Sequence, residues 1–134
     1  MNKVELVKLI QTLKIDKEEF WVLSSGALVL RGIWDDAKDL DIAVTNKGLS
    51  QLKRSYKLKP KNEECNDWFI VNDFIECVCD GEKEDLDYQP EVVDGIQVQN
   101  INQYLEFLEK SNREKDKARI KLVRDYIESQ EIDR

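Results

Sequence analysis

The segment from Phe20 to Thr45 constrains this chain more than any other part of the sequence. It reads FWVLSSGALVLRGIWDDAKDLDIAVT, a pattern that predicts a strand, a tight turn of small residues, a short helix, a loop and a second strand. The second strand alternates apolar residues with Asp39 and Asp41. Because side chains alternate between the two faces of a strand, both aspartates are expected on one face. Two carboxylates this close repel each other unless a cation lies between them, and a divalent metal ion is the usual solution.

The composition limits the classes of partner. A chain of 134 residues fits a single domain, 1–134, with a core of its own. Its net charge of −7 disfavours non-specific binding to a nucleic-acid backbone. The absence of histidine excludes histidine metal ligands and histidine general bases. No apolar run reaches the length needed to cross a membrane, so no membrane partner is expected.

The cysteines favour a reducing compartment. Cys77 and Cys79 lie two residues apart in an apolar run, and Cys65 stands alone. An odd number of cysteines in this arrangement predicts buried, reduced thiols rather than a zinc or redox site. Together with an N-terminus that has no signal-peptide pattern, this predicts a cytoplasmic protein.

The rest of the chain predicts an α+β fold. Apolar residues at helical spacing, together with capping residues, predict helices at 2–13, 27–33, 47–56, 101–108 and 113–130. Apolar runs and alternating patterns predict strands at 20–23, 40–44, 68–71, 74–79 and 96–99, with a hairpin turn at Asn72-Asp73. This order indicates a mixed β-sheet flanked by helices, with further helices at the C-terminus.

Glu76 is the candidate for a third metal-binding carboxylate. It interrupts the apolar run from Phe74 to Cys79 near its centre. A fully buried, unpaired charge costs several kcal/mol, and a bound metal would remove that cost. The alternative is that Glu76 lies on a solvated strand face. Asp73 and Asp80, at the strand ends, are rival candidates.

The turn Ser24-Ser25-Gly26 is the candidate phosphate-binding element. Small residues let the backbone approach a phosphate, and the free N–H groups at a helix start attract anions. An ordinary helix cap is the alternative interpretation. The argument for phosphate binding is the combination: the turn is followed, after one short helix and a loop, by the strand with the two aspartates.

Two segments of the chain together resemble the signature of a known family. Ser24-Ser25-Gly26-Ala27-Leu28, followed by Lys38-Asp39-Leu40-Asp41-Ile42, resembles the signature of the nucleotidyltransferase superfamily that includes DNA polymerase beta. The similarity is to small bacterial members, namely the lincosamide nucleotidyltransferases and the abortive-infection or toxin–antitoxin type. Gly95-Ile96-Gln97-Val98 and Arg113-Glu114-Lys115-Asp116 also resemble segments of those proteins.

The resemblance implies a metal-dependent transfer of a nucleoside monophosphate from a nucleoside triphosphate (NTP) to a hydroxyl group. Asp39, Asp41 and Glu76 would hold Mg²⁺ or Mn²⁺, with Glu76 also polarising the attacking hydroxyl. The residues that the resemblance assigns to nucleotide binding are Ser24, Ser25, Gly26, Lys115 and Asp116. Lys115 and Asp116 have a second role open to them, which is to anchor the last helix.

The chain departs from the family pattern in ways that keep other functions open. Ser24 and Ser25 occupy the family's two glycine positions, Gly26 replaces a threonine, and Arg119 replaces a later aspartate. These departures favour an alternative, a catalytically degenerate member that acts as a nucleotide-binding or protein-interaction module. A structural domain with an acidic surface is the third hypothesis.

Two further features bear on ligands. Trp34 is expected in the loop beside the site and is a candidate ligand contact, whereas Trp68 is expected in the core. The acceptor remains open between a small molecule, an RNA and a protein. A homodimer or a partner protein is a possible source of acceptor recognition.

Overall fold

The computed structural model describes residues 1–61, 67–79, 81–111 and 113–132. Within them, the helices are α1 (Lys3–Gln11), α2 (Ser24–Arg31), α3 (Asn46–Ser55), α4 (Ile101–Ser111) and α5 (Lys117–Ile132). The strands are β1 (Phe20–Val22), β2 (Leu40–Val44), β3 (Lys59–Pro60), β4 (Trp68–Ile70), β5 (Ile75–Val78), β6 (Glu91–Val93) and β7 (Ile96–Val98). Short 3₁₀ turns occur at Lys17–Glu19, Lys83–Asp85 and Glu114–Asp116. The predicted α+β class is confirmed.

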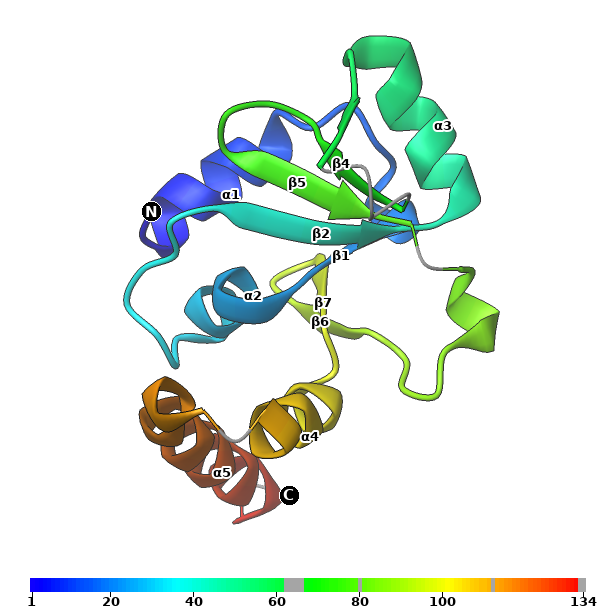
Figure 1. The fold of residues 1–134 in the computed structure, drawn as a ribbon. Helices are drawn as coiled ribbons and strands as arrows, with labels where there is room; N and C mark the ends of the chain where they lie inside the picture. Colours follow the sequence, from blue (N-terminus) through cyan, green and yellow to red (C-terminus); the bar gives the residue numbers. More distant parts are fainter. Residues whose placement is uncertain (62–66, 80, 112, 133–134) are drawn as a thin grey trace.

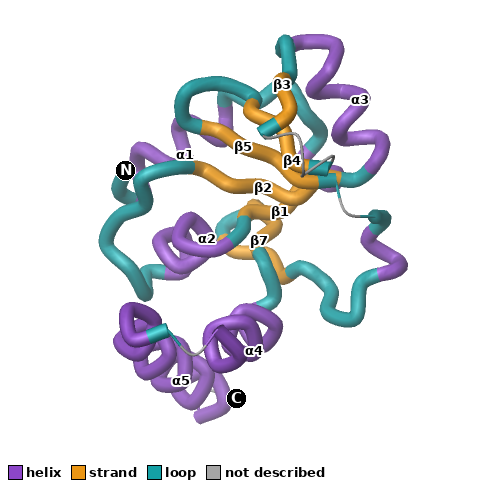
Figure 2. Tube along the Cα trace, in the orientation of Figure 1, coloured by secondary structure: helices purple, strands orange, loops and turns teal. Residues whose placement is uncertain are grey.

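The strands form one mixed sheet in the order β3-β4-β5-β2-β1-β7-β6, which appears as a twisted layer in Figure 2. The sheet is mixed because β1 and β2 are antiparallel whereas β2 and β5 are parallel. The predicted hairpin turn at Asn72-Asp73 joins the antiparallel strands β4 and β5. At the far edge, Asp94 and Gly95 both have positive φ and join β6 to β7, as a tight two-residue hairpin turn requires.

One face of the sheet is covered by α1, α2 and α3. Leu6 and Ile10 of α1, Leu30 of α2 and Leu52 of α3 are buried in one cluster with the inward side chains of the central strands. Those inward side chains are Phe20, Val22, Leu40, Ile42, Val44, Ile75 and Cys77. The predicted burial is confirmed for the Cys77 thiol, whereas Cys79 is only partly buried. Burial raises the pKa of Cys77 to about 12. Cys65 lies outside the described residues.

The alternate residues of the same strands point to the other side of the sheet, which we call the open face. Trp21, Ala43 and Val78 form a small apolar cluster there, and Asp41 and Glu76 occupy the corresponding alternate positions of β2 and β5. Period-two alternation thus separates the core from the carboxylates.

The helical pair α4 and α5 packs beyond α2, at the end of the molecule opposite α3 (Figure 1). Leu28 of α2 is fully buried against Ile101, Tyr104, Leu108 and Val123. This contact is important for the site, because it brings the start of α5 close to the start of α2. None of the described helices is long and apolar enough to span a membrane.

The first residues of two helices differ most from the sequence prediction. The helix expected at 27–33 begins at Ser24, because Ser24 itself makes the sharp turn with φ of 54°, so that Ser25 and Gly26 already lie in the first helical turn. The helix expected at 113–130 begins at Lys117. It is preceded by a 3₁₀ turn in which buried Asp116 accepts hydrogen bonds from the side chains of Ser111 and Arg113.

Candidate functional site

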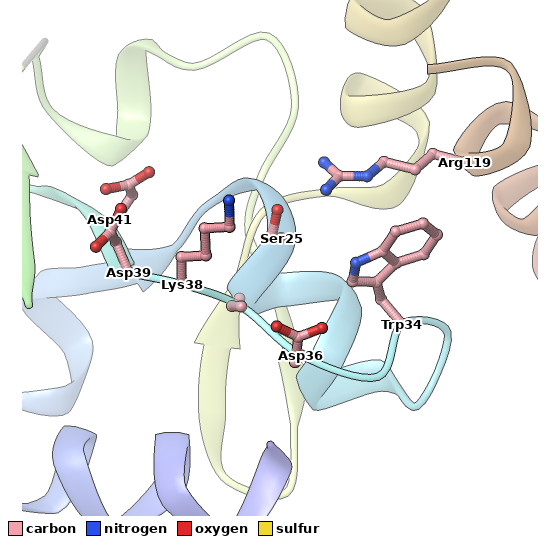
Figure 3. Close-up of a pocket in the computed structure, with 9 residues that line it drawn as sticks. Ser25, Trp34, Asp36, Lys38, Asp39, Asp41 and Arg119 are labelled. Atoms are coloured by element: carbon pink, nitrogen blue, oxygen red, sulfur yellow. The ribbon is translucent and has the colours of Figure 1, made fainter. Parts of the chain in front are cut away.

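Parallel pairing of β2 with β5 brings two of the predicted metal-binding carboxylates together. Asp41 lies directly opposite Glu76 in this register, and paired positions on adjacent strands are about 4.8 Å apart. Asp39 lies immediately before β2 and lines the same cavity as Asp41 (Figure 3). Asp73 lies in the β4–β5 turn and Asp80 is outside the described residues, so the register favours Glu76 over Asp73 as the neighbour of Asp41.

The carboxylates impose an electrostatic cost on one another. The pKa of Asp41 is raised, first by burial and then by the negative charges of Glu76 and Asp39. Lys61 opposes this shift, because its Nζ lies 3.1 Å from a carboxylate oxygen of Glu76. The open face therefore has an excess of negative charge at this point, which a further cation would relieve.

A cavity of about 450 Å³ opens beside Asp39 and Asp41. It lies between the first turn of α2, the loop that precedes β2, and α5, and we call it the carboxylate cavity. Its lining residues are Ser25, Gly26, Trp34, Asp36, Ala37, Lys38, Asp39, Asp41 and Arg119. Four of the residues predicted from the sequence, Ser25, Gly26, Asp39 and Asp41, are thus brought to one cavity, together with the predicted contact Trp34.

The first turn of α2 forms one wall of this cavity. The left-handed conformation of Ser24 turns the chain from β1 directly into the helix, and the Ser24 N–H donates a hydrogen bond of 3.1 Å to the Gln99 side chain. Ser25 and Gly26 follow, before the Ala27 N–H reaches back to the Leu23 carbonyl. Because the N–H groups of a first turn have no partner within the helix, those of Ser25 and Gly26 are available to bind an anion in the cavity.

Gly26 is constrained by packing as well as by the cavity. A Cβ atom at this position would lie 2.9 Å from Cγ1 of Val22, which is closer than two carbon atoms approach without displacement. The absence of a side chain therefore lets α2 lie tightly on β1. That close approach also keeps the first turn of α2 near the carboxylates.

Arg119 supplies positive charge on the opposite wall. Its guanidinium lies 4.7 Å from the centre of the Trp34 ring, and one of its nitrogens donates a hydrogen bond of 3.2 Å to the Tyr104 hydroxyl. Figure 3 shows this side chain reaching over Trp34 toward Ser25, with the Lys38 side chain between Ser25 and the aspartates. The cavity is therefore lined by two cations, Lys38 and Arg119, as well as by the carboxylates of Asp36, Asp39 and Asp41.

Three of the predicted nucleotide-binding residues lie elsewhere. Ser24 does not line the carboxylate cavity, Lys115 is exposed on the 3₁₀ turn before α5, and Asp116 is buried beneath that turn. Burial alone would raise the pKa of Asp116, but the hydrogen bonds from Ser111 and Arg113 and the charge of Arg113 outweigh it, so the pKa is lowered. These contacts favour the second role considered for Asp116, which is to anchor the last helix.

The carboxylates fit a hard divalent cation in their donor chemistry, because Mg²⁺ and Mn²⁺ prefer carboxylate oxygens. Over residues 1–61, 67–79, 81–111 and 113–132, however, the side chains do not form a group of three His, Cys, Asp or Glu residues that could hold a metal ion. Glu76 is paired with Lys61 instead. A three-carboxylate site would therefore require Glu76 to exchange Lys61 for the metal.

Four cavity residues were not predicted as binding residues from the sequence, namely Asp36, Ala37, Lys38 and Arg119. Lys38 was part of the motif but had no predicted role, although it directly precedes Asp39. Arg119 stood out only as a departure from the family pattern. It could not be placed without the packing of α5 against α2, which joins segments far apart in the chain.

Comparisons of the chain with family models, with curated proteins and with solved structures return no significant match.

Proposed function

We propose that this protein is a metal-dependent nucleotidyltransferase that moves a nucleoside monophosphate from an NTP to a hydroxyl group of an acceptor. The observation that carries the proposal is the juxtaposition of Asp39 and Asp41 with the first turn of α2 around one cavity. Negative charge on one side and phosphate-binding groups on the other are the parts that phosphoryl transfer requires, since its catalysis rests on positioning and charge stabilisation.

Different residues of the chain would bind the phosphates and the base of the NTP. The N–H groups and the Ser25 hydroxyl in the first turn of α2 would donate to phosphate oxygens. Arg119 and Lys38 would attract the polyphosphate as cations. The Trp34 ring, which lies beneath the Arg119 guanidinium, offers a stacking surface for the base.

Asp39, Asp41 and Glu76 would hold Mg²⁺ or Mn²⁺, which would neutralise negative charge on the transferring phosphoryl group and on the departing pyrophosphate. Glu76 has a second task, because an open-face carboxylate next to Asp41 can accept the proton of the acceptor hydroxyl.

The test is the thermal stability of the protein with Mg·ATP or Mg·GTP. We expect a saturable, Mg²⁺-dependent rise in Tm, because a ligand that binds only the folded state stabilises it. Asp39→Asn should abolish this rise. Asp73→Asn is the matched control, since Asp73 is an exposed aspartate that does not line the cavity. An unchanged rise in Asp39→Asn would contradict the assigned site.

A second candidate function is supported by the Lys61–Glu76 ion pair. If this ion pair persists, the third carboxylate stays occupied, and the protein binds nucleotide without transferring it. A labelled-NTP transfer assay with Mg²⁺ or Mn²⁺ against a cell extract separates the two functions. Labelled acceptor together with pyrophosphate supports transfer, whereas binding with no pyrophosphate release supports the non-catalytic module.

A further inference from the structure

A second, smaller hollow lies on the open face, next to the carboxylates. It has a volume of about 140 Å³, and we call it the apolar recess. Its apolar lining consists of Trp21, Leu23, Ala43, Val78 and Leu86, and Gln99 and Gln103 supply polar side chains. Trp21, Ala43 and Val78 are each less than a tenth exposed and form one apolar cluster, against which Leu86 packs from the loop after β5.

The strand register fixes the distance between the recess and the carboxylates. Ala43 pairs with Val78 in the same parallel register that pairs Asp41 with Glu76. Each apolar residue follows its acidic neighbour by two positions, so it lies on the same face and about 7 Å further along the strand. A group seated on Ala43 and Val78 therefore lies within one small molecule's length of the carboxylates.

The chemistry of the recess differs from that of the carboxylate cavity. The described lining contains no lysine or arginine, whereas the carboxylate cavity contains Lys38 and Arg119. A polyphosphate is thus favoured in the carboxylate cavity and disfavoured in the recess. Apolar cavities of about 150 Å³ bind a single aromatic ring, which matches the size of the recess.

We propose that the apolar recess is the acceptor subsite: it takes a ring-sized apolar group whose hydroxyl reaches the Asp41–Glu76 pair. This inference rests on the proposed nucleotidyl transfer. It assigns the acceptor to a class, an alcohol or phenol carried on one apolar ring. It disfavours a sugar, because a sugar has more hydroxyl groups than Gln99 and Gln103 can pair, and the others would be buried against Trp21 and Val78.

The transfer step follows from this placement. The acceptor oxygen forms a bond to the α-phosphorus of the NTP, and its proton passes to the Glu76 carboxylate. The bond between the α-phosphorus and the oxygen bridging to the β-phosphate breaks, and pyrophosphate leaves with that electron pair. The products are the acceptor esterified with a nucleoside monophosphate and free pyrophosphate, so no further reactant is needed.

The experiment uses 4-methylphenol as the probe and glucose as the competing hydroxyl compound. In the full chain, NMR titration should give saturable shifts of the Trp21 indole N–H and the Ala43 and Val78 amides with 4-methylphenol, and none with glucose. Ala43→Leu, which fills the recess, should weaken this binding at least tenfold. Val78→Ile, a milder change that keeps the fold if Ala43→Leu does not, should weaken it several-fold.

Ala118→Leu is the matched control, because it makes the same chemical change on the exposed surface of α5; it should leave 4-methylphenol binding unchanged. Mg·ATP affinity should stay within twofold in every variant, and labelled transfer from ATP to 4-methylphenol should fall in parallel with ring binding.

The outcomes separate the two proposals. If Mg·ATP binds but 4-methylphenol does not, or if filling the recess leaves ring binding or transfer unchanged, the acceptor subsite is wrong while the proposed function stands. A preference for glucose as acceptor also overturns the subsite. If the ring binds but Mg·ATP does not, the proposed function fails, and the acceptor role fails with it.

Discussion

Asp41 lies half-buried on the open face, with carboxylates on both sides of it. The raised pKa of this group means that the folded chain resists its negative charge, first because burial removes water and then because Glu76 and Asp39 repel it. Such an arrangement lowers stability and persists in proteins where function needs it. The excess of negative charge at this point also accounts for the ion pair between Lys61 and Glu76.

Asp41→Asn is expected to stabilise the protein by about 1 kcal/mol at pH 7, because it removes a charge that burial and two neighbours disfavour. This corresponds to a rise in Tm of a few degrees in a chain of this size. Because the pKa is raised in the folded state, the advantage of the variant should shrink as the pH falls and the wild-type carboxyl takes up its proton.

Thermal unfolding between pH 4 and pH 7 measures the effect, and Asp73→Asn provides the comparison at an exposed carboxylate. A lower Tm for Asp41→Asn at neutral pH would show that the carboxylate makes net favourable contacts instead. The same variant should lose the Mg²⁺-dependent rise in Tm with ATP, so that added stability and lost binding appear together.

At the scale of single elements, the junction of β1 and α2 shows what the sequence could and could not predict. The strand, the small residues and the helix that ends at Gly32 were all predicted, because burial, alternation and a left-handed glycine at a helix end leave clear patterns. The left-handed backbone of Ser24 was not predicted, because serine has no preference for it. The family's glycine at this position was the only signal, and the structure shows Ser24 in the conformation that glycine adopts most easily.

Ser24→Gly is expected to stabilise the protein by about 0.5–1 kcal/mol, because glycine removes the cost of a left-handed side chain at φ of 54°. The control is the same substitution one residue later. Ser25→Gly should destabilise the protein by about 0.5–1 kcal/mol, since Ser25 lies in the helix and has no positive φ. Urea unfolding of both variants measures the change in the free energy of unfolding. Equal effects at the two positions would show that the backbone of Ser24 is not strained.

At the scale of the whole molecule, the site depends on contacts between distant parts of the chain. Local patterns sufficed to predict the strand that carries Asp41, with Asp39 at its start, and the turn of small residues before α2, because both follow from the sequence within a few residues. The register that sets Glu76 opposite Asp41 and the docking of α5 that brings in Arg119 are long-range features. No local pattern encodes them, so the sequence favoured Glu76 over its rivals Asp73 and Asp80 without fixing the residue that it faces, and it assigned Arg119 no binding role.

Leu28→Ala is expected to destabilise the protein by about 2–4 kcal/mol, because Leu28 is fully buried between α2 and the α4–α5 pair. It should also weaken Mg·ATP binding, although Leu28 does not line the cavity, because α5 carries Arg119. Leu52→Ala is the matched control: Leu52 is equally buried, but in α3, at the end of the molecule opposite α4 and α5. It should cost similar stability and leave ATP affinity unchanged.

Calorimetric titration with Mg·ATP, at a temperature where both variants are folded, separates the two effects. Equal affinities in Leu28→Ala and Leu52→Ala would show that the position of α5 does not matter for binding.

The contact between Arg119 and Trp34 has a consequence for the synthesis of the protein. The carboxylate strand and the first turn of α2 leave the ribosome early, but the cavity gains its basic wall only when Arg119 has emerged and α5 has docked. Until then, Lys38 would be the cation that the emerged part of this cavity offers beside its aspartates. Under the proposed function, tight nucleotide binding would begin only after α5 has docked, so the ligand would report this docking rather than guide the folding that precedes it.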